Sequence, residues 1–256
     1  MGEGSRQRVL DALTGKIPDK VPYMYSTIHK NIREAIIGEK ITYKYPLPRA
    51  DFGSIGVLGE PAIMEPAENI DVRVAEKLGL DALGMRYLPP FYVNVGEGTS
   101  GLNVMGGLLL TPDTLDKIIL PDPDDEKMYQ PALEFCLRYK GEYALYAQIR
   151  LGVSFMMNSM TVEEFAYNTV DEPDFVKGVM EKYTKWVSRL VTNLQECGFV
   201  FLWTFDDMAY KKSLMFSPAT WDEFFAPYLR ESVSHIHVPW VFHSDGNLMP
   251  ILDKLL

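Results

Sequence analysis

The chain has 256 residues, of which 47% are hydrophobic and 23% charged, a balance typical of a globular protein with a large core. Its formal charge of −10 disfavours nucleic acid and anionic membrane surfaces as partners, because both attract lysine and arginine. No apolar stretch reaches the roughly 18 residues of a membrane span. Its length suits one barrel domain over residues 1–256, and its two cysteines favour the cytoplasm.

The first third of the chain predicts two helix–strand units separated by a long loop. Residues 4–15 have apolar side chains at helical spacing, and residues 21–26 form a run typical of a buried strand. Residues 40–70 are rich in proline and glycine, and long loops in compact domains are usually functional. A helix over residues 71–78 then precedes a strand over residues 80–87.

The middle of the chain predicts a hairpin and a third helix–strand unit. Residues 91–98 and 102–110 alternate around glycines, as expected of a β-hairpin. A helix is expected over residues 127–140 and a strand over residues 143–150. The long amphipathic pattern over residues 175–197 predicts a further helix whose aromatic stripe packs on the core.

The last fifty-odd residues predict two strands separated by a capped helix. Residues 199–205 and 238–243 are apolar runs rich in valine and aromatics, as in strands buried on both faces. Ser217 caps the helix expected over residues 217–228. About five strand–helix units are therefore expected, whereas eight close a barrel. The expected fold is an α/β, (β/α)8 TIM barrel that is incomplete at its C-terminus.

Polar residues follow these strands at the ends where catalytic residues of α/β barrels lie. An arginine there suits a carboxylate or phosphate of a substrate, and it suits an acidic partner within the chain equally well. His243 is open to two interpretations, a functional group or a paired structural histidine. The candidate substrate-binding residues are Arg86, Tyr87, Gln148, Arg150 and Tyr210, with Tyr25 and Trp203 as further candidates to line an apolar pocket.

Three stretches in the last fifty-odd residues carry a family resemblance. They are Phe205-Asp206-Asp207, then Ser217-Pro218 with Trp221, Glu223-Phe224 and Pro227-Tyr228, then Phe242-His243 with Asp245-Gly246-Asn247 and Ile251-Leu252-Asp253. This order resembles the uroporphyrinogen decarboxylase superfamily, which holds haem-pathway decarboxylases and corrinoid-dependent methyltransferases. Residues 6–22 are similar to the opening helix and first strand of that superfamily.

The methyltransferase branch of this superfamily implies a zinc site. Its His-x-Cys-Gly pattern resembles His243-Ser244-Asp245-Gly246, with Asp245 at the cysteine position. Its Glu-x14-Glu-x20-His pattern has the spacing of Asp207, Asp222 and His243, with the shorter aspartate at both glutamate positions. The resemblance thus implies Asp207, Asp222, His243 and Asp245 as metal ligands. Asp222 could instead stabilise a helix dipole, and Asp206 and Asp207 could form a hydrogen-bonded turn.

The resemblance implies a zinc- and corrinoid-dependent methyltransferase. It would move a methyl group between a small methylated substrate, such as an O-methyl ether, and a cobalamin-binding partner protein. Asp207, His243 and Arg86 are the expected catalytic residues.

Two alternatives stay open. One is decarboxylation of a tetrapyrrole, although the Arg-Gln-Ala-Gly-Arg-Tyr signature of that branch is absent at residues 23–28. Its Ser-Asp pair after the second strand is also replaced, here by Met85-Arg86-Tyr87. The other alternative is a non-catalytic barrel that only binds a ligand or a corrinoid protein.

Overall fold

The protein is described from a computed structural model that covers residues 4–41, 54–98 and 101–255. Its α-helices are α1 Gly4–Leu13, α2 Lys30–Ile37, α3 Val72–Leu78, α4 Gln130–Tyr139, α5 Val153–Ser159, α6 Val162–Asp171, α7 Pro173–Glu196, α8 Pro218–Phe224, α9 Ala226–Ser234 and α10 Leu252–Leu255. The 3-10 helices are η1 Pro112–Lys117, η2 Glu126–Tyr129 and η3 Met249–Ile251. Its strands are β1 Ala67–Glu68, β2 Ala82–Arg86, β3 Val93–Gly98, β4 Gly101–Gly107, β5 Ala144–Ile149, β6 Phe201–Phe205, β7 Ala209–Tyr210, β8 Ser213–Leu214 and β9 Trp240–His243.

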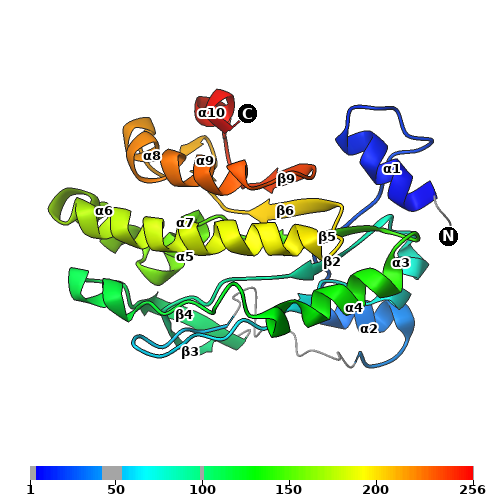
Figure 1. Ribbon diagram of the computed structural model, residues 1–256, viewed down its shortest axis with the longest axis horizontal. Coiled ribbons are helices and arrows are strands. Elements are labelled where there is room, and N and C mark those ends of the chain that lie inside the picture. The colour runs from blue at the N-terminus through cyan, green and yellow to red at the C-terminus, as the bar shows by residue number, and fades with distance from the viewer. Residues whose placement is uncertain (1–3, 42–53, 99–100, 256) are drawn as a thin grey trace.

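The main sheet has the strand order β1-β2-β5-β6-β9 (Figure 1). Strands β2, β5, β6 and β9 are parallel, whereas the two-residue β1 pairs antiparallel with β2. Helices separate the parallel strands along the chain, as crossover connections require. The α/β prediction is therefore confirmed. None of the helices in the described part of the chain is long and apolar enough to span a membrane.

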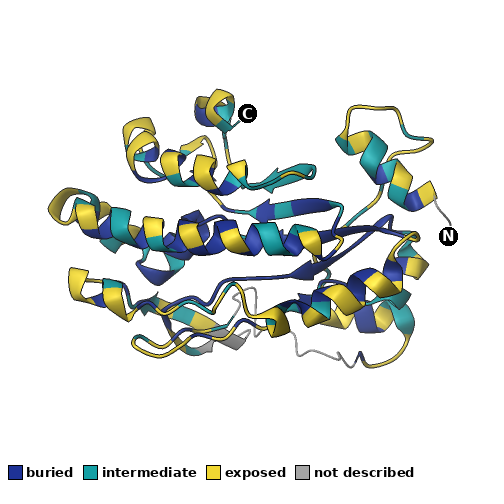
Figure 2. Cartoon of the chain, in the orientation of Figure 1, coloured by how far each residue is buried: buried dark blue, intermediate teal, exposed yellow. Residues whose placement is uncertain are grey.

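The two faces of the sheet bury different sets of side chains. Leu83, Leu145 and Leu202 belong to a large core shared with the helices. Residues of the opposite parity, such as Tyr146 and Phe201, pack in a second cluster with Val9 of α1. Figure 2 shows β2, β5 and β6 mostly buried, β9 of intermediate burial, and the helices exposed along their outer sides. Because strand side chains alternate between faces, each parallel strand turns every second residue toward the inside.

Gly84 lets the large Tyr146 ring lie inside the sheet. The two residues are register partners on β2 and β5, and Tyr146 is fully buried. A Cβ added at Gly84 would overlap the Tyr146 ring. The ring stacks on Phe201 of β6, with ring centroids 5.0 Å apart. This glycine–tyrosine–phenylalanine layer therefore fills the interior below the carboxyl ends of the strands.

Several local predictions are confirmed. Strands β3 and β4 form the expected antiparallel hairpin. The helix expected over residues 71–78 is α3, which begins at the side-chain cap of Asp71 and ends at left-handed Gly79. Ser217 accepts a hydrogen bond from the Thr220 amide and caps α8. The expected loop at 40–70 lies partly outside the described residues, because 42–53 are not described.

Two local predictions are wrong. Residues 21–26 run beside β2 but form no strand, because Pro22 lacks an N–H and the Tyr23 N–H bonds to the Asp81 side chain. The helix expected over 217–228 is instead divided into α8 and α9 at Phe225. Pro227 at the start of α9 cannot donate the hydrogen bond that would continue α8.

Replacing Gly84 by alanine should destabilise the fold, because the buried Tyr146 ring has no space to move. We expect the free energy of unfolding to fall by about 1–3 kcal/mol, as in overpacked cores. Urea denaturation of purified protein measures it. Gly106→Ala is the matched control, because a Cβ at Gly106 meets no atom within 4 Å. Equal stability of the two variants would contradict this packing.

Candidate metal centre

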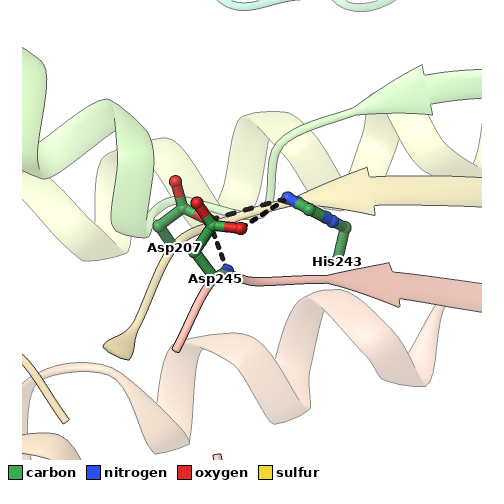
Figure 3. A group of neighbouring side chains, drawn as sticks. All are labelled: Asp207, His243 and Asp245. Carbon is green, nitrogen blue, oxygen red and sulfur yellow. Dashed lines mark hydrogen bonds and ion pairs between the residues drawn. The ribbon is translucent and has the colours of Figure 1, made fainter. Parts of the chain in front are cut away.

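Asp207, His243 and Asp245 meet beyond the carboxyl ends of β6 and β9 (Figure 3). One candidate ligand atom from each residue lies within 4.8 Å of the other two. His243 Nε2 is 3.9 Å from Asp207 Oδ1 and 3.7 Å from Asp245 Oδ1. Their side chains are 55% (Asp207), 43% (His243) and 82% (Asp245) exposed. The cluster is therefore open to solvent and to small molecules.

Hydrogen bonds between the two strand ends hold this cluster in place. The Asp206 amide donates to the His243 carbonyl at 3.1 Å, which extends the β6–β9 ladder by one step. The Met208 amide donates to Ser244 Oγ at 2.9 Å, and the Asp245 amide donates to Asp207 Oδ1 at 2.9 Å. Three separate bonds thus join the residues that flank the cluster.

Asp206 anchors the same region from below. Its side chain is fully buried and accepts hydrogen bonds from the Leu151 and Ser154 amides, at the start of α5. Burial raises the pKa of Asp206, and Arg150 together with these amides partly offsets that rise. Asp206 therefore ties the end of β6 to the loop after β5.

A cavity of about 240 Å³ adjoins the cluster at the carboxyl ends of the strands. Its lining includes Asp207 and His243 together with Arg86, Gln148 and Arg150. These side chains come from β2, β5, β6 and β9 or from the residues just after them, and all share the inward parity. The remaining lining residues are Ser26, Thr27, Leu88 and Phe205.

Three residues that the sequence suggested for the site lie elsewhere. Asp222 is outside the cluster, and both of its carboxylate oxygens accept hydrogen bonds from Lys254 Nζ, at 2.6 and 2.7 Å. Tyr87 has the outward parity, is fully buried and stacks on Tyr129, so it does not line the cavity. Tyr210 is exposed on β7 and does not line this cavity either.

The two further pocket candidates lie outside the cavity lining as well. Tyr25 hydrogen-bonds Tyr23 at the surface. Trp203 packs against the rings of Tyr146 and Phe205.

Residues 94–256 match the sequence profile described as uroporphyrinogen decarboxylase (URO-D). The chain belongs to the URO-D family. No curated protein matches the sequence. The fold is similar to that of a methyltransferase from Methanosarcina mazei, with a TM-score of 0.66 and 17% identity, covering 98% of this chain and 72% of the other. The URO-D fold is a TIM barrel, so the four parallel strands described above form part of a barrel wall.

The donor set of this URO-D chain fits a zinc ion. Imidazole and carboxylate both bind Zn²⁺, and two ligands on a tetrahedral ion lie roughly 3.4 Å apart. The His243–Asp207 and His243–Asp245 separations exceed that value by a few tenths of an ångström, and all three ligand atoms lie within 4.8 Å of one another. Three protein ligands beside a cavity also match the composition of catalytic zinc sites, which keep one position open.

Sequence reasoning missed two residues that shape the site. Asp206 was interpreted only as part of a hydrogen-bonded turn, whereas its partners are amides more than fifty residues away. Asn69 is fully buried and donates to Gln148, a cavity-lining residue 79 positions later. No local sequence signal marks such contacts, because they depend on which strands become neighbours.

Replacing Asp206 by asparagine should destabilise the protein, because an amide nitrogen would face a backbone N–H. An unsatisfied buried group of this kind costs about 1–3 kcal/mol. Chemical denaturation at pH 7 measures the loss. Asp122→Asn is the control, since Asp122 is exposed and its side chain accepts a hydrogen bond from the Asp124 amide, which asparagine can keep. If both variants unfold like the wild type, the anchoring role of Asp206 is wrong.

Proposed function

We propose that this chain takes part in methyl transfer between a small methylated substrate, such as an O-methyl ether, and a cobalamin-binding partner protein. The convergence of Asp207, His243 and Asp245 beside a polar cavity is the observation that carries the proposal. These residues would hold Zn²⁺. Bound there, zinc supplies a Lewis acid that stabilises a phenolate or thiolate.

The residues around the proposed metal would bind and orient the substrate. Asp207 and His243 line the cavity from the end of β6 and from β9, and Arg86 and Arg150 line it from β2 and the end of β5. The volume of about 240 Å³ is a little below the range of about 300–1,000 Å³ typical of ligand pockets, which suits a small substrate. The corrinoid partner would dock at this same end, because the reacting methyl group must reach the cobalt.

Membership of the URO-D family and the likeness to the Methanosarcina mazei methyltransferase support the proposal of methyl transfer. The arginines of the cavity favour one second candidate, decarboxylation of an acidic substrate such as a tetrapyrrole. That reaction would use Arg86 and Arg150 to hold carboxylates and would need no metal. The two candidates therefore differ most clearly in whether zinc is required.

Zinc content of the purified protein tests the proposal. Mass spectrometry should find close to one zinc per wild-type chain after dialysis against excess metal. His243→Ala removes one proposed zinc ligand. Changes to residues that only hydrogen-bond a metal ligand typically lower metal affinity by roughly 10–100-fold, so the zinc affinity of this variant should fall by more than that. Exposed His237 provides the control, because only its backbone amide is hydrogen-bonded, and His237→Ala should keep full zinc.

Absence of zinc from the wild-type chain would contradict the proposal and favour the metal-free decarboxylase candidate. Equal zinc in the wild type and in His243→Ala would place the ion elsewhere and contradict the assigned ligands.

A further inference from the structure

The cavity has two sides of opposite hydrogen-bonding character. Asp207 and His243, on the β6 and β9 side, offer metal-binding atoms. Arg86 and Gln148 are register partners on β2 and β5, and Arg150 follows two residues later. Arginine side chains carry only hydrogen-bond donors. Whether this second side also offers an acceptor therefore depends on which end of the Gln148 amide faces the cavity.

A chain of hydrogen bonds fixes the orientation of the Gln148 amide. The Tyr25 carbonyl can only accept, so the Tyr146 hydroxyl donates its proton to it at 3.0 Å. The Tyr146 oxygen must then accept from Asn69 Nδ2, which lies 3.0 Å away. The same Asn69 nitrogen lies 2.9 Å from Gln148, and the group that meets it must be the Gln148 Oε1 acceptor.

The free end of Gln148 is therefore its NH₂ group, a donor. Burial raises the pKa of Tyr146, so its hydroxyl keeps the proton that starts this chain of bonds. Gln148 is itself 93% buried and lines the cavity, since only 7% of its surface is exposed. Asn69 acts as a positioning residue, because its amide decides which end of Gln148 a bound molecule meets.

The two arginines add positive charge to the same side. Arg86 is only 6% exposed, and Arg150 is held by bonds from its Nη1 to the Phe205 carbonyl at 2.6 Å and to Ser154 Oγ at 3.0 Å. Asp206 lies close enough to Arg150 to offset part of that charge. A guanidinium presents its donors in a planar fork that matches the two oxygens of a carboxylate.

We propose that Arg86, Gln148 and Arg150 form a carboxylate subsite, so that the substrate is a small methylated carboxylic acid. The proposal rests on the proposed function in placing the reacting methyl group at the Asp207–His243–Asp245 cluster. A substrate bound this way spans the cavity, with its anionic group at β2 and β5 and its ether or thioether oxygen or sulfur at β6 and β9. A neutral methylated compound would place no anionic group against the Gln148 NH₂ donor.

Binding of a matched pair of probes tests the subsite without any turnover. Titration calorimetry on the purified full chain, loaded with zinc, compares 3-methoxybenzoate with 3-methoxybenzamide. The two differ only in the anionic group, and hydrogen bonds to charged groups are stronger than neutral ones. We expect the carboxylate to bind at least about tenfold more tightly. Equal dissociation constants for the two probes would overturn the subsite.

The Gln148→Glu variant tests whether the preference for the carboxylate probe comes from the proposed subsite. The glutamate can still accept from Asn69, but it replaces the donor that faces the cavity by a second oxygen. The carboxylate preference should fall at least about tenfold in this variant. Gln130→Glu adds the same charge at an exposed position on α4 and should keep the wild-type preference. An unchanged preference in a folded Gln148→Glu protein would contradict the assignment.

The zinc measurement separates the two proposals. A carboxylate preference without zinc binding would support this subsite and contradict the methyltransferase proposal. Zinc binding without a carboxylate preference would support the methyltransferase proposal and contradict this subsite.

Discussion

The parallel pairing of β2, β5, β6 and β9 is the constraint on which the site depends. Their register sets which residues are neighbours, and the two-residue period of a strand sets which of them face inside. Arg86, Gln148, Phe205 and His243 all have the inward parity. A shift of one residue in any of these strands would turn its inward-facing residue toward the outer apolar core. The same register pairs Gly84 with Tyr146, two residues before the pair of Arg86 and Gln148.

The inner layer then links packing to chemistry. Gly84 leaves room for Tyr146, and the Tyr146 hydroxyl starts the hydrogen bonds that orient Gln148. On the other side, buried Asp206 fixes the loop before α5 while its neighbour Asp207 faces solvent in the cluster. Adjacent residues of one sequence motif thus have separate roles, one in anchoring the loop and one in the candidate metal centre.

Much of this arrangement could be predicted from the sequence, because apolar runs ending in polar residues mark the carboxyl ends of buried strands. That pattern found Arg86, Gln148, Asp207 and His243. The spacing that implied Asp222 as a ligand came from the family resemblance, and a spacing along the chain does not decide where a helical side chain points. The Asp222 carboxylate instead accepts hydrogen bonds from Lys254. Asn69 gave no signal, since its role depends on a partner from another strand.

A crystal structure of the zinc-soaked protein, with anomalous diffraction recorded at the zinc edge, tests the central claim most directly. The account predicts one strong peak coordinated by Asp207, His243 and Asp245 at the mouth of the cavity. A peak that involves Asp222 without these three residues, or no peak at all, would contradict it.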